Sequence, residues 1–370
     1  MSQHRAELAA EGRVDQPAQS VDQAVQSVDE AVQSREGIRD RRRKRGGKRR
    51  RDEHQMVPDA TFTSYYGRPI VKASPWEADI PAYLFLGGVA AGSSLLGAGA
   101  GLTGRPVLRR AGRISALTAI SLSFAALVHD LGRPSRFVNM LRVAKPTSPM
   151  SVGTWILTAY GPLAGAAGAA ELLTPLAGRL PGSVRPPIRL LGRLAGPAGV
   201  GAAVVAPAVA SYTAVLLTHT STPTWSAARR HLPFVFVGSA AAASGGLGML
   251  LAPVSEAGPA RRLAVGGALL ELGVERSMEA SMGITAEPLH QGTGGMLMRA
   301  SKILTVLGAV GSLFGWRSRA LSALSGVSLM AGSACTRFGV FEAGQASART
   351  PKYTVVPQRQ RIERGESAGA

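Results

Sequence analysis

The sequence predicts an all-α polytopic membrane protein: a bundle of about eight transmembrane helices behind a disordered, basic N-terminal tail. Across residues 80–341, apolar stretches alternate with short loops that bear Arg, Pro and Gly. Several stretches run for about 20 residues with almost no charge, which is the helix length that spans a bilayer core of about 30 Å. The mean hydropathy is only +0.11, because polar tails at both ends dilute the apolar signal.

The same distribution divides the chain into four regions. Residues 1–58 form the basic tail, and residues 59–79 a polar linker whose aromatic side chains suit a membrane interface. Residues 80–345 form the transmembrane bundle, and residues 346–370 a polar C-terminal tail.

We expect the spans at about 80–102, 113–131, 151–176, 195–218, 232–252, 261–285, 296–316 and 319–342. The sixth is the least apolar, since it carries Glu271, Glu275, Arg276 and Glu279. Eight spans place both termini on one side of the membrane. Arginines in the loops opposite the termini favour a cytoplasmic position for those loops, whereas the basic tail favours cytoplasmic termini, so both orientations stay open.

The tail contains a run of charge, REGIRDRRRKRGGKRRRDE at 35–53, that cannot bury a core. No aromatic residues are interleaved for base stacking, so we interpret it as a solvated topogenic segment and expect no nucleic-acid partner. Anionic-lipid binding is the alternative. Two SVD(Q/E)AVQ heptads in the tail indicate a short amphipathic helix.

Metal-ligating residues are scarce. The single cysteine, Cys335, excludes a four-cysteine iron–sulfur cluster held by this chain alone. Histidines in or near the spans lie mostly at their ends and do not supply the two facing pairs of a di-haem bundle; they are His129, His219, His231 and His290. We therefore expect neither haem nor a cluster, and no metal site.

Ionisable residues at membrane depth point to function, because they are costly there. His129 and Asp130 end the second span, Glu271 lies within the sixth, and Arg337 within the eighth. A carboxylate such as Glu271 either pairs structurally with Arg337 or passes protons.

Several strings resemble one family. They are YLFLGGVAAG at 83–92, HDLGRPSRF at 129–137, NMLRVAKPTSPMSVG at 139–153, SYTAVLL at 211–217 and TRFGVFEAGQ at 336–345. Together they resemble the NrfD/polysulfide-reductase family of quinone-reactive membrane subunits, over about 76–346.

The resemblance implies an eight-helix anchor in the plasma membrane, without haem, that passes electrons between a partner and menaquinone or ubiquinone. The implied partners are a ferredoxin-like iron–sulfur subunit and a molybdopterin catalytic subunit. The family's quinone-contacting tyrosine would be Tyr212, and a second contact would be Tyr83. Ile80 stands where some members carry asparagine, which puts a fixed quinone pose in doubt.

Helix directions predict where these residues meet. Adjacent spans are antiparallel, so Tyr83, Tyr212, His129 and Asp130 should lie at one face of the membrane. We expect quinone binding by Tyr212, Tyr83 and His129. We expect proton transfer by Asp130, with Glu271 and Arg337 as further candidates.

The loop at 133–150 is long, polar and basic, which favours a docking surface for the iron–sulfur subunit. Its candidate contacts are Arg133, Arg136, Arg142 and Lys145. The alternative is an ordinary basic loop at the lipid headgroups. Two other functions stay open for the chain: a transporter, against which the lack of an internal repeat argues, and a purely structural anchor.

Overall fold

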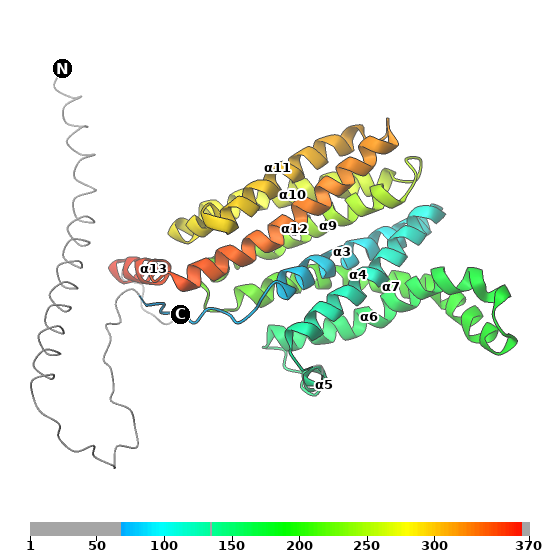
Figure 1. Ribbon diagram of the computed structural model, residues 1–370, viewed down its shortest axis with the longest axis horizontal. Coiled ribbons are helices and arrows are strands. Elements are labelled where there is room, and N and C mark those ends of the chain that lie inside the picture. Colours follow the sequence, from blue (N-terminus) through cyan, green and yellow to red (C-terminus); the bar gives the residue numbers. More distant parts are fainter. Residues whose placement is uncertain (1–67, 134, 365–370) are drawn as a thin grey trace, which may run out of the picture. The chain divides into compact units, whose positions relative to one another are not determined.

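The computed structural model describes residues 68–133 and 135–364, and this part of the chain is helical, without strands (Figure 1). The long helices are α3 (Asp79–Leu102), α4 (Pro106–Asp130), α6 (Pro149–Leu173), α7 (Arg185–Thr218), α9 (Leu232–Leu251), α10 (Gly258–Met282), α11 (Gly292–Phe314) and α12 (Arg319–Arg349). The short ones are α5 (Arg136–Leu141), η1 (Thr174–Arg179), η2 (Gly182–Val184), α8 (Pro223–Ala227), η3 (Gly283–Leu289) and α13 (Lys352–Glu363).

Each predicted span coincides with one long helix, and the prediction of an all-α polytopic bundle is confirmed. Six of the long helices are long and apolar enough to cross a membrane. The other two, α10 and α12, are also of crossing length but carry the buried charges Glu271, Glu275 and Arg337.

The structure departs from the predicted helix limits in several places. Helix α4 begins at Pro106, seven residues before the predicted 113. Helix α7 begins ten residues before the predicted 195, because two prolines fall in its first turn, where a missing N–H costs nothing. Helix α5 occupies part of the predicted loop. Helix α12 continues to Arg349, and α13 follows within the predicted polar tail. The predicted tail, including its heptads and basic run, lies outside the described residues.

Helix α3 is central to the bundle. It contacts α4 and α7 on one side and α9 and α12 on the other, so it joins the group α3, α4, α6 and α7 to the group α9 to α12 (Figure 1). Small residues allow this packing, as expected for membrane helices. A side chain at Gly112 of α4 would collide with the α3 backbone at Gly97, and one at Gly245 of α9 with the α10 backbone at Ala264.

Candidate functional site

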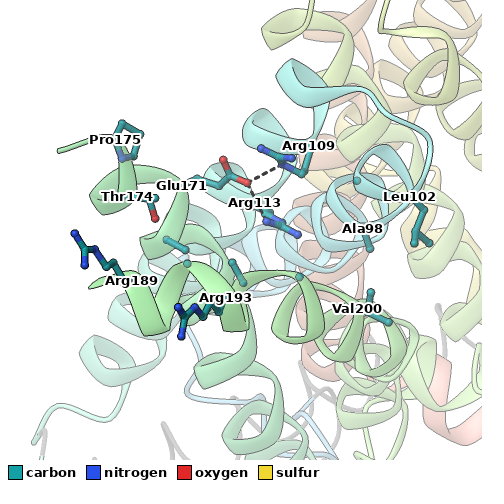
Figure 2. A pocket seen from close by; sticks show the side chains of 15 residues that line it. Ala98, Leu102, Arg109, Arg113, Glu171, Thr174, Pro175, Arg189, Arg193 and Val200 are labelled. Atoms are coloured by element: carbon teal, nitrogen blue, oxygen red, sulfur yellow. Dashed lines mark hydrogen bonds and ion pairs between the residues drawn. The ribbon is translucent and has the colours of Figure 1, made fainter. Parts of the chain in front are cut away.

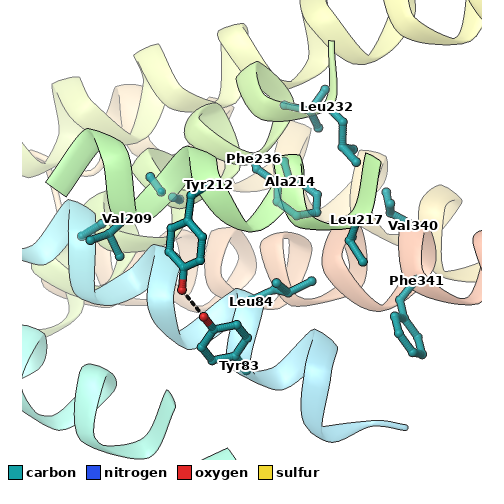
Figure 3. Close-up of a cluster of buried hydrophobic side chains, with 14 of the residues drawn as sticks. Tyr83, Leu84, Val209, Tyr212, Ala214, Leu217, Leu232, Phe236, Val340 and Phe341 are labelled. Carbon is teal, nitrogen blue, oxygen red and sulfur yellow. Dashed lines mark hydrogen bonds between the residues drawn. The ribbon is translucent and has the colours of Figure 1, made fainter. Parts of the chain in front are cut away.

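Two tyrosines from distant parts of the chain meet inside the bundle. The Tyr83 hydroxyl on α3 hydrogen-bonds the Tyr212 hydroxyl on α7, and the two rings point toward one another (Figure 3). Only 3% of Tyr83 and 8% of Tyr212 is exposed. Two hydroxyls carry two protons and their mutual bond uses one, so the pair retains a proton that can be donated to a ligand.

The tyrosine pair lines a cavity of about 290 Å³. Asp130, at the end of α4, and Arg136, at the start of α5, lie in the same wall, and the Arg136 guanidinium also donates to the Leu131 carbonyl at 3.2 Å. Ile80 lines the cavity too. The pocket therefore has apolar walls and a few convergent polar groups, the usual composition of a small-molecule site.

A second cavity of about 440 Å³ adjoins the first. The two share the wall residues Tyr83, Leu127, Thr154 and Leu157. Apart from a few hydroxyl groups, the second cavity is lined by aliphatic and phenyl side chains of α4, α5 and α6. Its lining suits a hydrocarbon chain attached to a polar head in the first cavity.

The position of the Tyr212 ring depends on a glycine. A methyl group at Gly153 of α6 would lie 2.5 Å from Tyr212 Cε2, so the ring packs directly on the α6 backbone. Gly153 is the last residue of the family-like string at 139–153, but the sequence alone did not indicate which residue it contacts. Thr154, beside it, also lines the cavity.

Helix α12 supports another wall of the cavity. The Gln345 side-chain amide donates to the carbonyls of Ser74 and Trp76 at 3.0 and 3.2 Å, and Trp76 lines the cavity. Trp76 stacks on Trp225, which in turn contacts Phe341. The string at 336–345 thus holds the linker that precedes α3.

His129 is at the same end of the bundle but outside the cavity wall. Its Nδ1 lies 2.7 Å from an Asp79 carboxylate oxygen, and 80% of its side chain is exposed. The structure therefore brings Tyr83, Tyr212 and Asp130 together and leaves His129 on the surface nearby.

The described part of the loop at 133–150 follows this end of α4. Four basic side chains, Arg133, Arg136, Arg142 and Lys145, are exposed, and so are the apolar Val138 and Val143. Phe137 of α5 packs edge-on against Phe124 of α4, with ring centroids 4.8 Å apart. Helix α5 also places Met140 in the first cavity and Phe137 and Leu141 in the second, so the loop covers both.

Glu271 and Arg337 lie in the other half of the bundle and form no direct ion pair within the described residues. Glu271 accepts a hydrogen bond from Thr336 at 2.6 Å, and its Oε2 is buried without a partner. Arg337 donates to the Phe236 carbonyl at 2.7 Å and lies over the Phe236 ring. Its Nε and Nη1 are also buried without a partner.

A row of charged residues leads from Glu271 toward the surface. Glu275, one turn along α10, lies 3.5 Å from Lys302 Nζ, and Glu279, one turn further, lies 2.8 Å from it. His290 lies 3.8 Å from Glu279 and is half-exposed. The row reaches the same end of the bundle as Asp130, because the helices alternate in direction. Among the described residues, no group of three or more His, Cys, Asp or Glu side chains is arranged to hold a metal ion.

The fold and the buried polar groups define a multi-pass helical membrane protein. Residues 70–278 match the model of a family described as polysulphide reductase, NrfD. Because the match spans more than half of the chain, the protein belongs to the NrfD family, whose members are membrane subunits of oxidoreductases that react with quinone. The match ends within α10, so the string at 336–345 lies beyond it. A comparison with curated proteins found no match.

Proposed function

We propose that this chain is the quinone- or quinol-reactive subunit of a multi-subunit oxidoreductase in the plasma membrane. Its proposed partners are a ferredoxin-like iron–sulfur subunit and a molybdopterin catalytic subunit. The observation that supports this most directly is the hydrogen-bonded pair Tyr83 and Tyr212: both line a mostly apolar cavity that also holds Asp130 and Arg136, and Tyr83 lines the adjoining apolar cavity as well.

The residues present fit a menaquinone or ubiquinone. When bound, such a group accepts two electrons and two protons on reduction. Tyr83 or Tyr212 donates its free hydroxyl proton in a hydrogen bond to a carbonyl oxygen in the first cavity. The neighbouring cavity, with its apolar lining, takes up the isoprenoid chain and excludes water.

Asp130 is the proposed proton carrier at this site. It is half-buried and lines the cavity at the end of α4, where a carboxyl oxygen can exchange a proton with water at the membrane surface. Arg136, whose side chain is exposed, also lines the cavity and supplies a positive charge beside Asp130. His129 is proposed only to hold the Asp79 carboxylate at this face of the membrane.

Glu271 and Arg337 are proposed as a second proton-transfer site. Unpartnered donors and acceptors buried together favour bound water, which would connect the Arg337 guanidinium to the Glu271 carboxyl group. Glu275, the Lys302–Glu279 pair and His290 continue the route to the surface.

The first experiment compares Asp130→Asn with Asp79→Asn in the complex purified with its native partner subunits. Both variants remove one carboxylate at the same membrane face, but only Asp130 lines the cavity. We expect oxidation of a water-soluble quinol analogue to slow by about 10²-fold in Asp130→Asn and to stay near wild type in Asp79→Asn. Equal turnover in wild type and Asp130→Asn across pH 6 to 8 would remove Asp130 from the mechanism.

A further inference from the structure

At the opposite end of the bundle from the tyrosine pair, a large basic cavity opens between α3, α4, α6 and α7 (Figure 2). Its volume is about 900 Å³. Four arginines and one glutamate line it: Arg109, Arg113, Arg189, Arg193 and Glu171. Their formal charges sum to +3, which favours an anion inside the cavity.

Glu171, the one carboxylate among these lining residues, does not accept hydrogen bonds from all of the arginine N–H groups. Arg109 Nε and Arg113 Nη1 donate to the same oxygen of Glu171, each at 2.9 Å. Arg113 is almost buried, with 11% of its side chain exposed, and its Nε has no hydrogen-bond partner. A buried N–H without an acceptor is costly, so this cavity lacks an acceptor that a bound anion would supply.

The backbone makes room for the buried guanidinium. A methyl group at Gly199 of α7 would lie 3.2 Å from Arg113 Nε and Nη2, so the guanidinium lies flat against that turn of α7. Arg189 and Arg193 approach from the preceding turns of the same helix, and both side chains are exposed. The Thr174 hydroxyl also lines the cavity.

The cavity is apolar at its other end. Leu102, 79% exposed, and Val200, 44% exposed, lie in its wall, and Val204, 74% exposed, follows one turn further along α7. Eleven residues separate Arg189 from Val200, about 16 Å along a helix. A charged end and an apolar end at this spacing match a phospholipid headgroup and the upper part of its acyl chain.

We propose that this cavity binds the headgroup of an anionic phospholipid such as phosphatidylglycerol. The phosphodiester oxygens accept hydrogen bonds from Arg113 Nε and from Arg189 and Arg193, and one acyl chain lies along Leu102, Val200 and Val204. Helix α7, with 34 residues, is about 51 Å long and exceeds the bilayer core of about 30 Å. Its N-terminal arginines therefore lie at headgroup depth.

The test is lipid binding by the full chain in detergent, followed by native mass spectrometry and by thermal stability. We expect dioleoyl phosphatidylglycerol to be retained and to raise Tm, whereas dioleoyl phosphatidylcholine does neither. Arg189→Gln/Arg193→Gln should weaken retention at least about tenfold, because the variant removes both charge-assisted hydrogen bonds that this pair of arginines donates. Neither arginine forms an ion pair within the described residues, so the bundle should fold.

The control is Arg110→Gln/Arg179→Gln, which removes two exposed arginines at the same end that do not line the cavity. A second variant, Gly196→Leu, keeps every charge and fills the cavity from a position that faces open space. We expect the control to retain lipid as wild type does and Gly196→Leu to lose it. Equal loss in the control would show diffuse surface attraction and overturn the proposal. Full retention in Gly196→Leu would overturn it as well.

A measurement with inorganic phosphate distinguishes a lipid phosphodiester from a free phosphate as the ligand of this cavity. If phosphate alone raises Tm as much as the lipid does, the acyl chain is not part of the ligand and the lipid assignment is wrong. No quinone enters these measurements, so the result is independent of the function proposed for the tyrosine pair.

Discussion

The Tyr83 hydroxyl on α3 hydrogen-bonds the Tyr212 hydroxyl on α7, across 129 positions in sequence. Ser123 of α4 donates to the Tyr83 carbonyl at 3.1 Å, and Gly153 of α6 supports the Tyr212 ring. Four helices therefore fix one polar contact. A pair of hydroxyl groups held this firmly in an apolar setting is pre-organised to receive a single hydrogen-bond acceptor.

The first prediction concerns the two hydroxyls. Tyr212→Phe and Tyr83→Phe should each weaken binding of a quinone analogue about three- to tenfold, which corresponds to one hydrogen bond. Thermal shift of the full chain with decylubiquinone measures this. Tyr160→Phe is the control, because Tyr160 is buried and bonds Ser94 at 2.7 Å without lining either cavity. Wild-type binding in both site variants would leave the tyrosines a packing role only.

The second prediction concerns the glycine beneath Tyr212. Gly153→Ala should push the ring into the cavity and lower quinone-analogue binding by about tenfold or more, since the added methyl group would lie 2.5 Å from the ring. Gly165→Ala lies more than three turns further along α6. Its added methyl group meets nothing within 4 Å, so it serves as the matched control. If the two variants bind alike, the cavity does not depend on the Tyr212 position.

The third prediction concerns proton transfer through Glu271. Glu271→Gln preserves the acceptor for the Thr336 hydroxyl, so the free energy of unfolding should change by about 1 kcal/mol or less. Quinol-linked proton release from the reconstituted complex should nevertheless fall, because an amide does not exchange a proton at this position. The control is Ser301→Ala, which removes the hydroxyl that contacts Thr336 but keeps the Glu271 carboxylate. Unchanged proton release in Glu271→Gln would show that the Glu271 carboxylate does not transfer protons and has a packing role only.

The fourth prediction concerns the loop at 133–150. Replacing Arg136, Arg142 and Lys145 by Ala should release the iron–sulfur partner while the bundle stays folded, since all three side chains are exposed. Co-purification from the membrane measures this. The control, Arg110→Gln/Arg179→Gln, removes positive charge at the opposite end. Loss of the partner in both would point to net charge rather than to the loop.

The fifth prediction concerns pH and the attachment of α13. The hydrogen bond from Lys352 lowers the pKa of Glu287, and the same bond raises the pKa of Lys352. The Lys352 Nζ lies 2.9 Å from the carboxylate, and the Tyr353 hydroxyl donates to it at 3.1 Å. Burial raises the pKa of Tyr353, which keeps that donor protonated.

These pKa directions determine how the attachment of α13 depends on pH. Glu287 stabilises the attachment above its unfolded pKa of about 4.3, and this contribution is lost as the pH falls through the lower folded value. The Lys352 contribution is complete below about 10.4 and is lost as the pH rises through its raised pKa. A spin label at Arg359→Cys, in a Cys335→Ser background, should become mobile below about pH 4. In Glu287→Gln it should be mobile at every pH, whereas Glu363→Gln should match wild type.

The long apolar stretches of the sequence by themselves determined the fold class of this protein. Stretches of about 20 apolar residues leave the backbone no hydrogen-bond partners in lipid except its own, so they must be helices. The strings HDLGRPSRF and NMLRVAKPTSPMSVG indicated the family, and alternating helix direction placed Tyr83, Tyr212 and Asp130 at one end of the bundle.

Only the tertiary structure decided which of these groups meet. Membrane depth follows from counting residues, but the rotation of each helix about its axis depends on packing with its neighbours. That rotation aims Tyr83 at Tyr212 and leaves His129 outside the cavity with Asp79. It also leaves Glu271 and Arg337 without a direct ion pair and gathers arginines of α4 and α7 around one cavity. These contacts join residues far apart in sequence, through close approaches that glycines such as Gly153 and Gly199 permit.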